Sequence, residues 1–267
     1  MKKIFLIILS IFIIIFILTN LLFFKENKQG NIYEKYPFYK KENIDRYIKY
    51  QNTNPNLNTK DIIIRVNLNL DQPDYTNISK SKYLNSNNIL VNKHIYLPND
   101  YIPTDLVKIN PKYTVSDKYL TKEANNSLEK MINDIKKANL NLRVISAYRS
   151  YSYQENLYNQ YVLKDGTFKA DTYSARPGYS EHQTGLVIDV DNIKTDYEHF
   201  HETEEYIWMK NNSYKYGYIL RYPKGKENIT TYQYESWHYR YVGIETATYI
   251  HQNNISFDEY YAIFLDE

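Results

Sequence analysis

The apolar positions of this chain begin with one long uninterrupted run. From Ile4 to Phe24 no residue is charged, and the run has the length of the ~20 residues that a helix needs to cross the hydrocarbon core of a bilayer. It is longer than the apolar core of a cleavable signal peptide, and no small-x-small cleavage site follows it. We therefore expect residues 1–24 to form an uncleaved transmembrane anchor or signal-anchor, and the polar, aperiodic residues 25–40 to form a tether.

Behind the tether, helical and extended patterns follow one another without the strict β-α-β order of a parallel sheet. The most regular helical pattern runs from Glu123 to Asn139, where apolar residues recur at intervals of three and four. Further helices are predicted at 42–50, 151–162, 203–214 and 244–251, and strands at 142–146, 185–190, 216–222 and 232–242. These elements predict an α+β fold with a small, mainly antiparallel sheet and flanking helices.

Other stretches leave the type or the limits of an element open. Asp61 to Leu70 fits a strand or a short helix, because periodicity alone does not separate the two. Residues 164–180 are polar and aperiodic and are predicted to be a loop. We expect an N-terminal extension at 41–88, a compact domain at 89–252 and a C-terminal tail at 253–267.

Composition and charge exclude several classes of function. The 33 Lys and Arg residues are balanced by 31 Asp and Glu residues, for a net charge of +2, and the basic residues are scattered among acidic ones. A nucleic-acid-binding protein would gather positive charge on one face, so no nucleic-acid partner is expected. Cysteine is absent, which excludes disulfides, a cysteine nucleophile and thiolate metal sites. Any metal ligands must therefore be His, Asp or Glu.

A histidine and an aspartate flank a glycine inside the compact domain. His182 precedes a predicted strand and Asp189 lies at its far end, so the two can converge on one ion, although their spacing does not require it. Each also fits a structural role, as a loop histidine bonded to the backbone and as a strand-end carboxylate. A catalytic zinc site needs three protein ligands and an open position for water, so a third ligand has to come from elsewhere.

Glu235 and His238 form a Glu-x-x-His motif inside the last predicted strand. The histidine can bind a metal while the nearby carboxylate takes a proton from water, whose pKa falls from ~16 to ~7 on zinc. The same spacing also fits a Glu–His pair on a sheet face. Arg149 follows a buried strand, where a guanidinium can point into a cleft and stabilise an oxyanion; a solvated arginine at a strand end is the alternative.

Two further patterns carry less weight. His199 and His201 alternate, as residues on one face of a strand do, but acidic residues surround them and a solvated acidic segment is the expectation. Two Ser-x-x-Lys matches, at 79–82 and 127–130, resemble part of a serine-nucleophile motif, yet no Lys-Thr-Gly follows them. In a chain rich in Ser and Lys such short matches arise by chance.

Three separated motifs have a characteristic order and spacing. They are Ser146-Ala-Tyr-Arg-Ser150 followed by Gln154, the run Ala175-Arg-Pro-Gly-Tyr-Ser-Glu-His-Gln-Thr-Gly-Leu-Val-Ile-Asp189, and Glu235-Ser-Trp-His-Tyr-Arg-Tyr-Val-Gly243. Together they resemble the VanY-type D-alanyl-D-alanine carboxypeptidases, which are LAS-type zinc peptidases, grouped with lysostaphin-type and hedgehog-type folds. The resemblance is strongest over residues 89–250.

The resemblance implies a metal site and a catalytic base. His182, Asp189 and His238 would hold one Zn²⁺ per chain, and no other cofactor is implied. Glu235 would activate water as a base and then protonate the leaving D-alanine.

The resemblance also implies contacts to the substrate. Arg149 would stabilise the oxyanion, and Gln154 and Ser180 would contact the terminal D-alanine. This chain departs from the family pattern at Ile188, where a small residue is common, and at Ser236, where proline is common. Neither departure touches the implied chemistry.

The implied function is zinc-dependent hydrolysis of the terminal D-alanine from peptidoglycan stem peptides. An L,D-carboxypeptidase acting on tetrapeptide stems, a serine D,D-peptidase and a non-catalytic cell-wall-binding zinc protein of the same fold are the alternatives. We expect the N-terminal helix to contact the membrane, and we expect no obligate protein partner. The expected location is the cell membrane of a Gram-positive bacterium, with a single-pass anchor and the catalytic domain outside; residues 46–75 resemble an extension of Gram-positive members.

Overall fold

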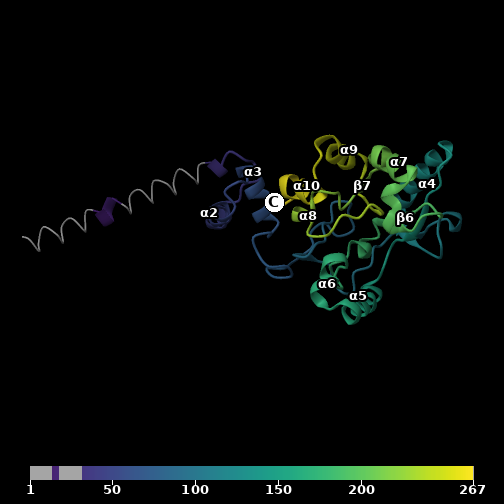
Figure 1. Cartoon of the computed structure of the whole chain (residues 1–267), viewed down its shortest axis with the longest axis horizontal. Helices are drawn as coiled ribbons and strands as arrows, with labels where there is room; N and C mark the ends of the chain where they lie inside the picture. The colour runs from purple at the N-terminus through teal and green to yellow at the C-terminus, as the bar shows by residue number, and fades with distance from the viewer. Residues whose placement is uncertain (1–13, 18–31, 267) are drawn as a thin grey trace, which may run out of the picture. The chain divides into compact units, whose positions relative to one another are not determined.

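The computed structural model of the chain describes residues 14–17 and 32–266 (Figure 1). Most of the predicted anchor, 1–24, and residues 25–31 of the predicted tether, 25–40, lie outside these residues and stay predictions. The rest of the predicted tether, 32–40, is folded: Tyr33 is buried in a small core, and Tyr36, Phe38 and Tyr39 pack against that core. Of the helices that the structure does describe, none is long and apolar enough to cross a membrane.

The described residues form two compact units. One consists of the residues up to Asp71 together with those from Ala262 onward, and the other consists of Gln72–Tyr261. The first unit contains the 3₁₀ turn η1 (Lys41–Asn43) and two helices that pack on each other, α2 (Ile44–Thr53) and α3 (Thr59–Asn67).

The stretch that fitted either a strand or a short helix is the helix α3. Asn58 caps its first turn, because the Asn58 side chain accepts a hydrogen bond from the backbone N–H of Asp61 at 2.9 Å. The apolar residues Ile62, Ile63 and Val66 are fully buried in a small core that includes α2. Burial against a neighbouring helix therefore decides between two structures that the pattern alone allows.

The second unit is organised around a four-stranded antiparallel sheet. Its strands, in spatial order, are β5 (Arg143–Ser146), β6 (Val187–Asp191), β8 (His238–Tyr241) and β7 (Tyr218–Leu220). Two smaller sheets pair β1 (Ser79–Lys80) with β2 (Ile95–Tyr96) in parallel and β3 (Leu106–Lys108) with β4 (Tyr119–Thr121) in antiparallel. Every residue of β6 is buried, so this strand lies at the centre of the core.

Helices pack around this sheet and make the fold a mixed α+β fold (Figure 1). They are α4 (Lys122–Lys137), α5 (Tyr151–Asp165), α6 (Thr167–Tyr173), α7 (Glu204–Asn212), α8 (Glu227–Thr230), α9 (Ile244–Asn253) and α10 (Phe257–Phe264). Short 3₁₀ turns complete the unit at η2 (Pro111–Tyr113), η3 (Glu181–Thr184), η4 (Tyr197–Glu202) and η5 (Ser213–Tyr216). The predicted stripe of α4 is confirmed, since Leu128, Met131 and Ile135 are fully buried in the core beside Val144 and Val190 of the sheet.

The structure corrects two predicted elements. The predicted loop 164–180 contains α6, which begins after Gly166, a residue with the positive φ of 78° that ends α5. This helix has only seven residues and carries the highly exposed Phe168, so it shows no buried stripe for a pattern to reveal.

The predicted strand 232–242 is also shorter than expected. Only His238–Tyr241 pairs in the sheet, and the preceding residues form a loop behind α8. Tyr232 of that loop is buried, and its ring contacts that of Tyr222 in a tilted arrangement with the ring centroids 5.2 Å apart. The aromatic pattern in this segment predicts a strand, but it reflects burial of part of the loop and no strand pairing. The predicted tail 253–267 contains a further helix, α10.

Candidate active site

The glycine between His182 and Asp189 sets the path of the chain through the site. Gly185 follows the turn η3 with a φ of 67°, in the left-handed region that favours glycine. A Cβ atom here would lie 2.8 Å from the Leu106 side chain and 3.2 Å from Pro103, so a larger residue would strain the backbone and force these neighbours to shift. The chain can therefore turn sharply after His182 and enter β6 with Asp189 in register.

The register of the sheet brings Asp189, His238 and Ser146 side by side. Asp189 of β6 lies opposite His238 of β8 and beside Ser146 of β5. Residues in register on neighbouring strands present their side chains on the same face. Residues that are far apart in the sequence thus form one row across the sheet.

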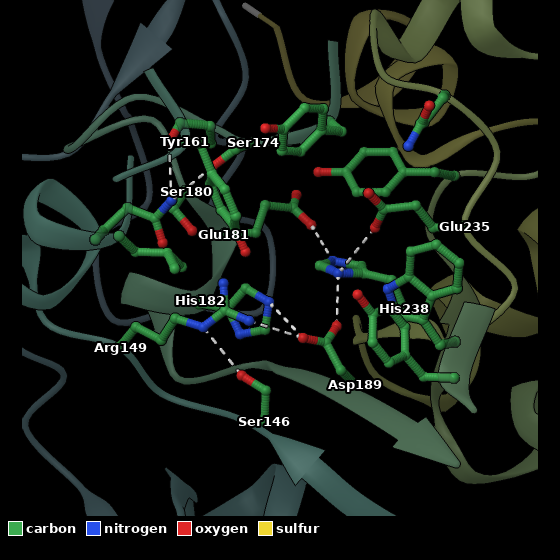
Figure 2. Close-up of a pocket in the computed structure, with 18 of the residues that line it drawn as sticks. Ser146, Arg149, Tyr161, Ser174, Ser180, Glu181, His182, Asp189, Glu235 and His238 are labelled. Atoms are coloured by element: carbon green, nitrogen blue, oxygen red, sulfur yellow. Dashed lines mark hydrogen bonds and ion pairs between the residues drawn. The ribbon is translucent and has the colours of Figure 1, made fainter. Parts of the chain in front are cut away.

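Three of the predicted residues form a cluster that fits a metal ion. One ligand atom from each of His182, Asp189 and His238 lies within 4.8 Å of the others. Nε2 of His182 is 3.3 Å from Oδ2 of Asp189, and Nδ1 of His238 is 3.0 Å from Oδ1 of Asp189 (Figure 2). All three residues are buried, and Asp189 Oδ1 makes no well-formed hydrogen bond to any described residue.

This donor set suits zinc. Two imidazole nitrogens and one carboxylate oxygen are zinc ligands, and a set of three leaves a position for water. Nδ1 of His182 lies 2.6 Å from the carbonyl oxygen of Ala147, so this nitrogen carries the proton and Nε2 is free to bind a metal. Burial, and next the charge of Arg149, lower the pKa of His182 to about 4, which keeps the imidazole neutral.

The charges in the cluster favour a cation. Burial raises the pKa of Asp189, but His182 and His238 lower it by more, so this carboxyl stays ionised. Burial lowers the pKa of His238, but the neighbouring carboxylates of Asp189, Glu181 and Glu235 raise it to about 9. Without a metal, His238 therefore holds a proton between carboxylates, and metal binding would displace this proton.

Glu235 lies next to the cluster but outside it. It belongs to the loop before β8, and its Oε2 is 3.5 Å from Nδ1 of His238. Burial, followed by a smaller contribution from Asp189, raises the pKa of Glu235 to about 7 against the opposing charges of His238 and Arg149. A carboxyl group that titrates near neutrality can accept a proton and return it within one reaction cycle.

Arg149 approaches the cluster from the other side. It lies between β5 and α5, and its Nη2 donates to Oδ2 of Asp189 at 2.9 Å while its Nε donates to Oγ of Ser146 at 3.0 Å. Of the described residues that line the cavity over the cluster, it carries the only guanidinium group. Its position allows it to meet negative charge that develops on a substrate.

A cavity of about 550 Å³ opens over these residues. Gln154 and Ser180, the predicted substrate contacts, are buried and line it. Nε2 of Gln154 donates to the carbonyl oxygen of Ala175 at 2.8 Å, whereas its Oε1 makes no hydrogen bond to a described residue. This amide oxygen is itself buried, so a ligand would reach it only if the side chain moved.

The cavity also has walls that the sequence did not reveal. Tyr161, Lys164, Lys169 and Tyr173 of α5 and α6 line it, and so does Trp237. The residues of α5 and α6 lie in none of the three motifs, and α6 is predicted to be loop, so no pattern indicates them. Trp237 lies within the Glu235–Gly243 motif, but its residue type alone does not indicate a place in the cavity wall.

The second histidine pair lies elsewhere. His199 and His201 are on η4, with side chains that are 60% and 44% exposed and with their nearest carboxylate in Glu202. Their rings are 6.3 Å apart. Within the described part of the chain, the metal-binding geometry is found at His182, Asp189 and His238 and does not include this pair.

Comparisons with known proteins agree with this geometry. The VanY family model, described as D-alanyl-D-alanine carboxypeptidase, matches residues 117–244. A D-alanyl-D-alanine carboxypeptidase of Enterococcus faecium is 30% identical over 264 residues, which cover 97% of this chain and 78% of that protein. YodJ of Bacillus subtilis (strain 168) is 41% identical over 179 residues, which cover 64% of this chain and 66% of the length of YodJ.

Solved structures share the fold at comparable identity. The LD-carboxypeptidase LdcB is 37% identical with a TM-score of 0.66, covering 72% of this chain and 92% of that one. A variant of the vancomycin-resistance D,D-pentapeptidase VanY, solved in complex with Zn(II), is 31% identical with a TM-score of 0.57, covering 65% of this chain and 98% of that one. With 97% of its length aligned to a D-alanyl-D-alanine carboxypeptidase at 30% identity, and with a cluster that suits zinc, the chain belongs to the VanY family of D-alanyl-D-alanine carboxypeptidases.

Proposed function

We propose that the protein is a zinc-dependent D,D-carboxypeptidase that hydrolyses the terminal D-alanine from peptidoglycan stem peptides. One observation carries the proposal: His182, Asp189 and His238 converge on one point, and Glu235 stands beside them without joining the cluster. Structural zinc sites are usually closed by four protein ligands. A three-residue cluster with an adjacent carboxyl group that titrates near neutrality supports catalysis over a structural role.

The residues around the cluster divide the reaction among them. When bound by His182, Asp189 and His238, zinc supplies a Lewis acid that lowers the pKa of water from ~16 to ~7. Glu235 takes a proton from the attacking water and returns it to the amine of the departing D-alanine.

The remaining side chains bind the substrate and stabilise the tetrahedral intermediate. Arg149 is placed to stabilise the oxyanion of the tetrahedral intermediate through its guanidinium. Gln154 and Ser180 line the cavity, where their side chains would contact the terminal D-alanine. His182, Asp189, Glu235 and His238 are themselves buried, and a low effective dielectric strengthens electrostatic contacts made there.

An L,D-carboxypeptidase acting on tetrapeptide stems is the second candidate. The higher TM-score to LdcB, 0.66 against 0.57 for VanY, favours it, whereas the matched family model and the Enterococcus faecium relative favour D,D-specificity. Both activities release free D-alanine, so the identity of the substrate has to be tested directly.

The test uses purified protein loaded with zinc and two defined muropeptides, one with a pentapeptide and one with a tetrapeptide stem. Mass spectrometry before and after incubation measures the loss of one alanine residue from each. We expect faster loss from the pentapeptide, abolition by a chelator and no effect of penicillin. Faster loss from the tetrapeptide would establish the L,D alternative. Intact substrates, with zinc measured as bound, would overturn the catalytic proposal.

We further propose that the apolar run from Ile4 to Phe24 anchors the protein in the cell membrane with the catalytic domain outside. The length of the run and the absence of a cleavage motif support an uncleaved anchor. Only residues 25–31 of the predicted tether would then be free to extend, over up to ~25 Å, because Tyr33 lies in the core of the first unit and Tyr36, Phe38 and Tyr39 pack against that core. Membrane fractionation and added protease on intact cells test this; a domain that stays protease-resistant until lysis would contradict it.

A further inference from the structure

A carboxylate next to the first metal ligand lies in a buried ionic network. Glu181 is 2% exposed, and its Oε1 accepts hydrogen bonds from Nε of Arg221 at 2.9 Å and from Nη1 of Arg240 at 2.6 Å. Both arginines are completely buried. A buried charge without a partner destabilises a fold by several kcal/mol, so each of these groups depends on the others.

The network continues into the C-terminal helix α10. Nη1 of Arg221 donates to Oδ2 of Asp258, which is also completely buried. Two carboxylates therefore balance two guanidinium groups in the interior. The matched family domain ends at residue 244, so α10 and its carboxylate lie beyond it. Asp258 nevertheless completes the charge balance around Glu181.

The other carboxylate oxygen of Glu181 faces a metal ligand. Oε2 of Glu181 is 3.8 Å from Nε2 of His238, and Figure 2 shows Glu181 on the side of this ring away from Asp189. Both atoms are buried and make no hydrogen bond to any described residue. Nδ1 of the same ring faces Asp189. The imidazole thus presents one nitrogen to the metal cluster and the other to Glu181.

The tautomer of His238 links these observations. An imidazole that binds a metal through Nδ1 carries its proton on Nε2 and needs an acceptor there. The Glu181 oxygen is the acceptor in place, and the two atoms need to approach by about 0.6–1 Å to form a normal hydrogen bond. The guanidinium groups of Arg221 and Arg240 hold the carboxylate from behind.

We propose that Glu181 is a positioning residue which holds His238 in the tautomer that offers Nδ1 to zinc, and that Asp258 of α10 supports it through Arg221. The proposal rests on the proposed function in one respect, that His238 is a metal ligand. It adds that the site extends to a helix outside the matched family domain. Partners of this kind typically change metal affinity by 10–100-fold.

The first experiment measures zinc affinity by competition with a chelating indicator, which requires no catalytic activity. For Glu181→Gln we expect an affinity about 10–100-fold weaker than that of the parent, with an unchanged far-UV circular dichroism spectrum. Glu205→Gln is the matched control, because Glu205 is also a buried carboxylate, accepting from Asn141 N at 3.2 Å and Asn192 Nδ2 at 3.1 Å. The control should bind zinc like the parent. Equal affinities for Glu181→Gln and the parent, or equal losses in both variants, would overturn the proposal.

Asp258→Asn and NMR keep the proposal testable if Glu181→Gln does not fold. Asp258→Asn changes no residue of the cavity, and we expect it to weaken zinc binding several-fold. In the zinc-loaded parent with ¹⁵N-labelled histidine, His238 should carry its proton on Nε2, slow to exchange with solvent. A proton on Nδ1 would overturn the proposal. At saturating zinc, Glu181→Gln should regain most of the parent's D-alanine release; a parent that binds zinc without releasing D-alanine would contradict the proposed function alone.

Discussion

Asp189 and His238 are direct cross-strand partners in the β6–β8 ladder, and their side chains meet with Oδ1 3.0 Å from Nδ1. A shift of this register by one residue would turn His238 to the opposite face of the sheet. The set of metal-ligand residues therefore depends on the pairing of β6 with β8 as much as on the identity of its residues. The pairing with β5 extends the dependence to Ser146, which holds Arg149.

Replacing Asp189 should remove the metal. Asp189→Asn removes the anionic ligand. Loss of a residue that only hydrogen-bonds to a metal ligand can weaken metal binding by ~100-fold, so we expect zinc affinity to fall by at least that factor. Equilibrium dialysis with metal analysis measures this. Asp191→Asn is the control on the same face of β6, because Asp191 pairs with Arg143 at 2.6 Å outside the cluster. Full zinc occupancy in Asp189→Asn at low free zinc would show that Asp189 is not a ligand.

Replacing Glu235 should separate metal binding from catalysis. Glu235→Gln keeps the shape of the side chain but removes its ability to hold a proton, so we expect kcat to fall by ~10²–10⁴. Zinc content should stay at one per chain, since Glu235 lies outside the ligand cluster. Steady-state D-alanine release and metal analysis on one sample give both values. A variant as active as the parent would remove Glu235 from the mechanism.

Arg149→Lys tests the geometry of the guanidinium group. A lysine ammonium cannot reproduce the two contacts that Arg149 makes with Ser146 and Asp189. We expect kcat/KM to fall by ~10²–10³, as for the loss of one oxyanion donor. Arg143→Lys on β5 lies outside the cavity and should retain kcat/KM within a few-fold. Similar values for both variants would place Arg149 outside the reaction.

Truncation in the core should affect stability alone. Leu128 of α4 is completely buried, so Leu128→Ala should lower the free energy of unfolding by about 2–5 kcal/mol. Lys130→Ala on the exposed side of the same helix should change it by less than ~0.5 kcal/mol. Urea unfolding measures both, and the folded fraction of each variant should keep the kcat of the parent. A lower kcat in folded Leu128→Ala would mean that α4 shapes the site directly.

The ion pair between Asp171 of α6 and Arg176, in the loop before η3, should make the free energy of unfolding depend on pH. Burial raises the pKa of Asp171, but hydrogen bonds from Arg176 and Tyr158 lower it by more, so it lies below its ordinary value. A carboxyl group with a depressed folded-state pKa contributes stability that is fully present above the unfolded pKa of ~3.9 and is lost as pH falls through the folded value.

We therefore expect the loss of unfolding free energy in Asp171→Asn to be constant above about pH 5 and to shrink below about pH 4. Urea unfolding of parent and variant at several pH values between 3 and 7 measures the difference. A difference that grows as the pH falls would contradict the sign of the shift.

Much of the fold could be predicted from local pattern. The helix at 123–139 is observed as Lys122–Lys137, because it has a full apolar face of its own, and the strand at 142–146 is observed as Arg143–Ser146 around the buried Val144. The motif residues His182, Asp189 and His238 were selected by residue type and spacing, and the structure brings their ligand atoms together. These features depend on neighbours that are close in the sequence or on chemistry that few residue types can perform.

Tertiary structure decided the features that depend on residues far apart in the sequence. Residues 61–67 of the open stretch 61–70 belong to the helix α3, which packs on α2, and α6 forms without a buried stripe of its own. The pairing of Glu181 with Asp258 through Arg221 joins residues whose order in the chain carries no sign of contact. The sequence by itself determined which side chains can bind zinc and move a proton. Only the fold decided which charges surround them, because a buried charge takes its partners from whatever elements the core brings near.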